Sequence, residues 1–289
     1  MYASPPRYVD GLPRPARCLV MGVVNVTPDS FSDGGRWLDP ELAVKRGRQL
    51  VAEGADIVDV GGESTRPGAV RPSVQEELDR VLPVVRTLAG EGVLISVDTM
   101  RAEVARAAVQ AGAVVVNDVS GGRADEAMFE TVARAGVAYV LMHWRAQSRE
   151  MMQHSVYDDV VEDVMAELRV QLAAAIAAGI DPGRIAVDPG IGFSKTADQN
   201  WDVLAATERF HELGHPLLVA ASRKRFLGVL LADDEGNLRP PIQRDDGTTA
   251  TSAFAAAAGA WCIRAHSARS TSDAVKVASR WAATRGRDG

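Results

Sequence analysis

Short apolar runs alternate along the chain with longer segments in which apolar residues recur at helical spacing. The apolar runs read as strands and cover residues 18–24, 57–60, 94–97, 114–116, 139–142, 185–187, 217–221 and 261–263. The helical segments cover residues 40–53, 74–88, 101–111, 125–135, 157–178, 197–213, 248–258 and 271–283. This regular alternation is typical of parallel strands that are joined by crossover helices.

Roughly eight βα units in about 250 residues predict an α/β fold, a (β/α)₈ or TIM barrel. No Ser/Gly-rich linker or charge run divides the chain of 289 residues, so we expect a single domain over residues 18–289. Residues 1–17 show neither apolar periodicity nor a strand run, and they read as a flexible N-terminal extension.

Side chains able to bind or catalyse follow nearly every apolar run. In chain order they are Asn25, Glu63, Asp98, Asn117, His143, Asp188, Ser222, Lys224, Arg264 and His266. The carboxyl ends of barrel strands line the active site, so we expect these residues to converge on one face. A doubly wound open sheet is the alternative, but it binds its ligand at a switch point fed by fewer strand ends.

Composition narrows the classes of function. The formal net charge of −6 argues against nucleic acid as the main partner, although basic residues at 222–225 and 264–266 could hold an anion locally. No apolar stretch is long enough for a membrane helix, and no signal peptide is recognisable before Cys18. Cys18 and Cys262 lie in apolar runs without redox spacing, which suits buried thiols in the cytoplasm.

One stretch matches a zinc-binding sequence motif but is not expected to form the continuous helix that the motif requires. His211 to His215 spell H-E-x-x-H, which binds zinc when both histidines share one face of a continuous helix. Gly214 lies inside the motif and Pro216 follows it, so the helix is expected to end near Leu213. We therefore reject zinc, and no P-loop or dinucleotide fingerprint supports a nucleotide instead.

Two polar, Gly-rich segments follow the first two strands, at residues 25–35 and 61–68. A βα turn is typically about 2–6 residues long, so longer ones suggest functional loops. The segments 21–35 and 59–68 closely resemble those of bacterial dihydropteroate synthases, and so do 96–99, 117–121, 188–193 and 222–224, in the same order. This resemblance spans the chain from about Cys18 onward.

The resemblance implies a transferase of folate biosynthesis on a pterin-binding barrel. Such enzymes join 6-hydroxymethyl-7,8-dihydropterin pyrophosphate to 4-aminobenzoate, giving 7,8-dihydropteroate and pyrophosphate. It further implies Mg²⁺ as the cofactor, these two small molecules as substrates, sulfonamides as inhibitors and a homodimer.

A pterin edge presents adjacent N–H groups and a carbonyl, which a carboxylate, an amide and an ammonium can satisfy together. By resemblance, Asp188 binds the 2-amino and N3 edge, Asn117 the ring nitrogens, and Lys224 the oxygen and N5 side. Asp98 would lie close to the ring as the fourth catalytic residue, with Met142 and Phe193 packed against the pterin. Taken alone, Asp98 could be a helix cap and Asn117 a turn residue.

The leaving group requires cations and donors. Arg264 can clamp pyrophosphate with two hydrogen bonds, His266 can donate to it, and Asn25 resembles the family's Mg²⁺ ligand. By resemblance, the aminobenzoate pocket and the closing loops use Phe31, Asp33, Thr65, Arg66, Pro67 and Ser222. Ser267 departs from the acidic residue that is more usual after the histidine, and a serine can still cap the last helix.

Two rival functions remain open. A methyltetrahydrofolate methyltransferase that works with a corrinoid partner would share Asp98, Asn117 and Asp188, but it needs neither the pyrophosphate clamp nor the first loop. A non-catalytic pterin-binding paralogue would be expected to have lost Arg66, Lys224 or Arg264, and the chain has all three. We read His143 as a structural histidine.

Overall fold

The computed structural model describes residues 8–27, 39–64, 71–146 and 151–285. Its strands are β1 Leu19–Asn25, β2 Ile57–Gly61, β3 Ile95–Asp98, β4 Val115–Asp118, β5 Ala138–Met142, β6 Ile185–Asp188, β7 Leu218–Val219 and β8 Cys262–Ala265. Each pairs in parallel with its neighbours in the order β6-β5-β4-β3-β2-β1-β8-β7, and a bridge between Val187 and Leu217 joins the two edges. The strands therefore close into the predicted barrel.

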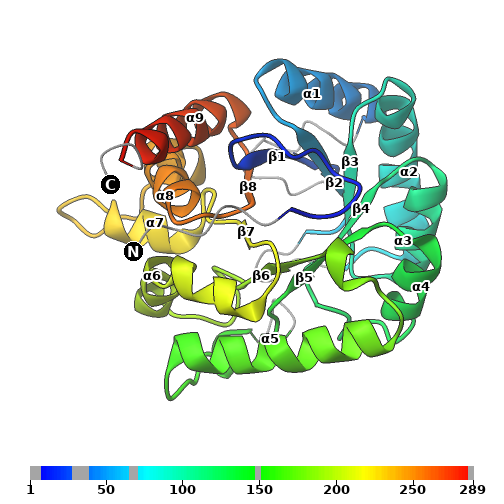
Figure 1. The fold of residues 1–289 in the computed structure, drawn as a ribbon. Helices are drawn as coiled ribbons and strands as arrows, with labels where there is room; N and C mark the ends of the chain where they lie inside the picture. Colours follow the sequence, from blue (N-terminus) through cyan, green and yellow to red (C-terminus); the bar gives the residue numbers. More distant parts are fainter. Residues whose placement is uncertain (1–7, 28–38, 65–70, 147–150, 286–289) are drawn as a thin grey trace.

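The helices lie around this barrel (Figure 1). They are α1 Pro40–Ala52, α2 Val74–Gly90, α3 Ala102–Gln110, α4 Met128–Ala135, α5 Val160–Ala177, α6 Ala197–Ala205, α7 Arg225–Leu230, α8 Asp245–Ala257 and α9 Ala268–Arg285. Short 3₁₀ helices cover Met151–His154, Pro182–Arg184, Thr207–Leu213 and Pro241–Arg244. Asp39, Ser73, Asp159 and Thr196 cap the N-termini of α1, α2, α5 and α6 with their side chains.

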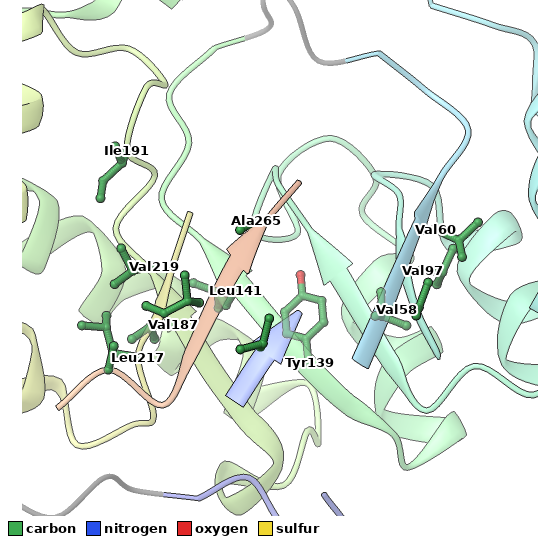
Figure 2. Packing of buried hydrophobic residues seen from close by; sticks show 14 of the residues in the cluster. Val58, Val60, Val97, Tyr139, Leu141, Val187, Ile191, Leu217, Val219 and Ala265 are labelled. Carbon is green, nitrogen blue, oxygen red and sulfur yellow. The ribbon is translucent and has the colours of Figure 1, made fainter. Parts of the chain in front are cut away.

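Strand alternation divides the core into two parts. Val58 and Val60 of β2 belong to the cluster between the strands and the helices, part of which Figure 2 shows. Ile57, one position away, belongs to a smaller cluster formed by strand residues and the N-terminal segment. Successive side chains of a strand point to opposite faces, so this second cluster fills the barrel interior. Above it, the inward positions at the carboxyl ends of the strands are available for a site.

The N-terminal segment corrects one expectation. Residues 8–17 are not loose, because Val9 and Leu12 are buried within the interior cluster. Asp10 N–H donates to Gly183 O at 2.8 Å, and Arg17 binds both carboxylate oxygens of Asp56 at 2.7 and 2.8 Å. Val9 and Leu12 are buried in this cluster and Tyr8 packs against it, but so few apolar residues show no periodicity. The division into an extension of 1–17 and a domain of 18–289 stays a prediction.

The helices differ from the prediction in two places. The predicted helix 197–213 is α6 followed by the 3₁₀ helix Thr207–Leu213, and the Thr207 hydroxyl donates to Leu204 O at 2.6 Å where the α-helix ends. The six-residue helix α7 was not predicted, since it is too short to display a periodic pattern.

The H-E-x-x-H letters do not form one helical face. The 3₁₀ helix ends at Leu213, as expected, and Gly214 adopts a left-handed conformation with φ 83°. His211 Nε2 lies 2.8 Å from Ala258 O, whereas His215 Nδ1 lies 3.3 Å from Ile185 O. The two rings thus bind carbonyls on different elements.

Candidate active site

The polar strand ends meet at one level of the barrel. Asn25 is paired with Gly61, Gly61 with Asp98, and Asp98 with Asn117 across β1 to β4. On the next pair of strands, Met142 is level with Asp188. Val97 and Val187 belong to the outer cluster, so the residues that follow them, Asp98 and Asp188, face the interior. Asn25, Asp98, Asn117 and Asp188 of the predicted set therefore converge on one face of the barrel.

Arg264 links two carboxylates at the centre of this site. Its Nε donates to Asp59 Oδ2 at 2.6 Å, and its Nη2 donates to Asp98 Oδ2 at 2.6 Å. Asn117 Nδ2 donates to the same oxygen of Asp59 at 3.1 Å. Asp98, predicted to lie near the pterin or else to cap a helix, is thus tied to Arg264, whereas at the N-terminus of α3 it is Asp125 Oδ2 that accepts from Ala102 N–H, at 2.8 Å. The Asn117 side chain likewise makes a contact across the barrel, to Asp59, and does not serve a turn alone.

Asp59 was missed by the sequence analysis. It is fully buried, and its second carboxylate oxygen, Oδ1, accepts no hydrogen bond within the described residues. A carboxylate in the middle of an apolar strand run is a signal that could have found it, because an ionised group is rarely buried without a partner. Here the partner is Arg264, which comes more than two hundred residues later in the chain.

Burial and the neighbouring carboxylates act on the pKa of Asp98 in one direction, and Arg264 acts in the other. Burial raises the pKa of Asp98 to about 7, the nearby Asp59, Glu77 and Glu63 act in the same direction, and Arg264 acts in the opposite direction. Burial alone would lower the pKa of Arg264, but Asp59 and Asp98 raise it above its ordinary value. Arg264 therefore stays charged and holds the two carboxylates side by side.

Asp188 and Lys224 form the other side of the site. Asp188 is buried, its Oδ1 accepts from Gly190 N–H at 2.8 Å, and burial raises its pKa. Burial lowers the pKa of Lys224 to about 8, although Asp188 acts to raise it. The Lys224 ammonium donates to Ile191 O and lies 4.8 Å from the centre of the Phe193 ring. These groups supply a carboxylate acceptor, an ammonium donor and an aromatic face.

The remaining predicted residues of the described chain lie around these two groups. Met142 is buried at the end of β5, and Asn25 is half-buried at the end of β1. Ser222 Oγ lies 2.9 Å from His266 Nδ1 and accepts from His266 N–H at 3.1 Å. Ser222 thus connects the end of β7 with the end of β8, where the leaving group was expected.

Five predicted residues lie outside the described residues, namely Phe31, Asp33, Thr65, Arg66 and Pro67. The positions that flank the second of their loops are held firmly. Arg71 Nε binds Glu63 Oε2 at 3.0 Å, and Arg101 binds both the buried Glu77 and Pro72 O. The end of this loop is therefore fixed beside the Asp98 strand.

The family model for pterin binding enzymes matches residues 21–266. The chain is also 56% identical over 263 residues to the dihydropteroate synthase of Mycobacterium leprae, an alignment that covers 91% of this chain and 93% of that protein. The chain belongs to the dihydropteroate synthase family. It is therefore a transferase of folate biosynthesis, which decides against the methyltransferase and the non-catalytic paralogue.

Solved structures of other dihydropteroate synthases have the same fold. The enzyme of Yersinia pestis in complex with a sulfonamide drug is 39% identical with a TM-score of 0.89, covering 96% of this chain and 98% of that one. The enzyme of Xanthomonas albilineans in complex with 7,8-dihydropteroate is 41% identical with a TM-score of 0.82, covering 97% of this chain and 99% of that one. The single-domain (β/α)₈ barrel predicted for this chain is confirmed.

Proposed function

We propose that this dihydropteroate synthase binds the pterin between Asp188, Asn117 and Lys224 at the carboxyl ends of its strands. The observation that carries the proposal is the arrangement of a buried carboxylate, a buried amide and an ammonium around the same end of the barrel. Asp188 would accept from the 2-amino and N3 groups, while Lys224 would donate to the ring oxygen and N5 side. Met142 and Phe193 would pack against the ring.

The carboxylates of Asp59 and Asp98 suit the chemistry at the pterin methyl group. Departure of pyrophosphate leaves a pterin-methyl cation, and negative groups held close to the ring stabilise such a charge. The arylamine is neutral at pH 7 and attacks the cation after positioning alone. Water would compete for the cation, so we assign its exclusion to the loops that contain Phe31, Asp33 and Arg66.

The leaving group would lie at the ends of β1 and β8. The Arg264 guanidinium carries five N–H donors, more than its two bonds to Asp59 and Asp98 use. His266 follows β8, and its backbone N–H donates to the Ser222 hydroxyl, so both residues lie beside the end of β8 that carries Arg264. We therefore assign Arg264 and His266 to pyrophosphate, and Ser222 with Thr65 and Pro67 to the aminobenzoate pocket, which is also where sulfonamides would bind.

The residues present fit a Mg²⁺ ion. Mg²⁺ commonly takes one or two protein oxygens together with waters and substrate phosphates, and Asn25 offers an amide oxygen at the half-buried end of β1. No cluster of three or more His, Cys, Asp or Glu side chains competes for a metal within the part of the chain that the structure describes. When bound, the ion would neutralise charge that develops on the pyrophosphate.

The activity is tested by pyrophosphate release from purified protein supplied with dihydropterin pyrophosphate and Mg²⁺. We expect release to require 4-aminobenzoate and to yield dihydropteroate in equal amount, because the amine is the acceptor of the pterin-methyl group. Equal release with and without the arylamine would instead indicate hydrolysis of the substrate and contradict the transfer of the pterin-methyl group to the arylamine.

Asn25→Ala is expected to raise the Mg²⁺ concentration for half-maximal activity about tenfold or more, because the ion would lose its protein oxygen. The pterin site is formed by other strands, so binding of a pterin that lacks pyrophosphate should be unchanged. Titration of activity with Mg²⁺ measures the first effect. An unchanged Mg²⁺ titration would remove Asn25 from the metal site.

We further propose that the enzyme is a homodimer that uses the surface of α8 and α9. Phe254 of α8 is 76% exposed, and Val277 and Trp281, one turn apart on α9, are 66% and 65% exposed. Exposed apolar residues of this size on neighbouring helices are typical of an interface. Phe254→Glu is therefore expected to give a monomer in sedimentation velocity, whereas Val170→Glu at an exposed position of α5 should not.

We also propose a cytoplasmic location. Both cysteines are buried free thiols, which suits a reducing compartment. Among the described helices, none has the length and apolar character required to cross a membrane.

A further inference from the structure

Lys195 is a buried lysine that the proposed reaction does not use. Only 3% of its surface is exposed, and its ammonium lies within hydrogen-bond distance of Gly190 O at 3.1 Å, Phe193 O at 3.2 Å and His143 Nδ1 at 3.1 Å. An ammonium has three N–H donors, and these three acceptors use all of them. Burying such a charge is costly, so its retention suggests a role.

His143, the histidine that contacts Lys195, is held on its other side by Glu167, which pairs with Arg145. His143 is fully buried, and burial together with Lys195 lowers its pKa to about 4, so the ring is neutral. Since Nδ1 accepts from Lys195, Nε2 carries the proton and donates to Glu167 Oε2 at 3.0 Å. Arg145 holds the Glu167 carboxylate through Nε and Nη2. The contacts run from α5 through His143 to Lys195.

Lys195 binds residues 190–193, a segment that lies between the two proposed pterin ligands Asp188 and Lys224 and contacts both. Its two backbone acceptors, Gly190 and Phe193, lie at the two ends of this segment. On the other side, Gly190 N–H donates to Asp188, and Ile191 O accepts from Lys224. The segment also needs restraint, because Ser194, directly after it, has φ 48°, an unfavourable backbone conformation for a residue other than glycine.

We propose that the Lys195 ammonium is a positioning group for the pterin site, which fixes residues 190–193 so that Asp188, Lys224 and Phe193 meet the ring together. The inference rests on the proposed placement of the pterin. It assigns Lys195 no contact with substrate. The neutral amine has only two N–H donors and one lone pair, so it would leave one of its three acceptors without a donor and loosen the segment.

The charge of Lys195 changes near neutral pH. Burial lowers the pKa of Lys195 to about 7, with Asp188 and Glu167 acting to raise it and Lys224 and Arg145 acting to lower it. Tyr157 also faces the ammonium, at 5.9 Å from its ring centre. The protonated form, which binds all three acceptors, therefore dominates below about pH 7, and pterin affinity is expected to fall as the pH rises through this value.

Glu167→Gln separates this titration from the others in the site. Glu167 acts on the pKa of Lys195, but the groups that shift Asp98 and Lys224 do not include it. Removing its negative charge should move the Lys195 titration to lower pH while Asp98 and Lys224 titrate as before. Glu162→Gln is the matched control, because Glu162 lies on the same helix and pairs with Arg209 at the surface.

The experiment measures the dissociation constant of 6-hydroxymethylpterin, a pterin without pyrophosphate, between about pH 5.5 and 9 with the full-length protein. For the wild type we expect pterin binding to weaken about tenfold as the pH rises through about 7. This is the equivalent of one lost hydrogen bond from a charged donor. Glu167→Gln should move this step to lower pH and leave the low-pH affinity unchanged. Lys195→Met should bind about tenfold more weakly at the low end of this pH range and lack the step.

Three results would overturn the inference. The first is a Lys195→Met variant with wild-type affinity and pH profile. The second is a Glu167→Gln variant that weakens binding equally at every pH with the step unmoved, which would mean a general structural role. The third is a wild-type protein that does not bind the pterin at any pH, which alone among these would also contradict the proposed pterin site.

Discussion

Replacing Asp188 by asparagine is expected to lower kcat/KM by about a thousandfold, with the loss in pterin binding as well as in turnover. The side chain keeps its shape, and the amide oxygen can still accept from Gly190 N–H, so the segment after β6 should stay in place. The pterin, however, would lose a charged acceptor for two adjacent N–H groups. Hydrogen bonds to charged groups contribute about 1.5–3 kcal/mol each, so two of them account for a loss of this size.

The amide also adds a repulsive contact. One half of the new side chain would present N–H groups to the donors of the pterin, and a donor that faces a donor inside a buried site leaves both unsatisfied. Measurement of steady-state rates and of pterin binding checks the prediction. Asp202→Asn, at an exposed position of α6, is the matched control and should behave as the wild type. A variant of Asp188 with normal pterin affinity would require another carboxylate as the ligand.

The barrel could be predicted from the sequence because its periodic signals repeat. Each strand run is followed by polar residues, and the parallel register places Asn25, Asp98 and Asn117 at one level. Because side chains alternate along a strand, all three point toward the barrel interior. The sequence therefore contained the positions of the proposed pterin ligands. It did not contain their partners, since a contact such as that of Arg264 with Asp59 depends on barrel closure between distant segments.

The same reason explains what was missed. Asp59 looked like part of an apolar strand, and no motif drew attention to Lys195, yet both are buried against groups that come from other elements. Val9 and Leu12 were missed because two apolar residues make no pattern, although both are buried in the interior cluster. Local spacing predicts elements, whereas the partner of a buried charge is known only when the elements have been placed together.

Replacing Arg264 by methionine is expected to destabilise the fold by about 3–5 kcal/mol at neutral pH, the usual cost of removing one partner from a buried ion pair. Methionine keeps much of the aliphatic volume but leaves Asp59 and Asp98 facing each other without a cation. Urea unfolding of the variant and the wild type at about pH 5.5 and pH 8 measures the effect. Arg134→Met, which removes an exposed partner of Glu130, should change stability by less than about 1 kcal/mol.

The loss of stability in Arg264→Met should also depend on pH, in a direction that follows from the pKa of Asp98. In the wild type the pKa of Asp98 in the folded state is about 7, above its ordinary value of 3.8, so the folded state binds more protons and stability falls as the pH rises between these values. Without the cation this pKa rises further, and the fall continues to higher pH. The variant should therefore be much closer to the wild type at the lower pH than at the higher one.

Adding Asp59→Asn to Arg264→Met should restore part of the lost stability at the higher pH by removing one of the two uncompensated charges. An equal loss at both pH values, unaffected by Asp59→Asn, would mean that Arg264 stabilises the barrel by packing alone.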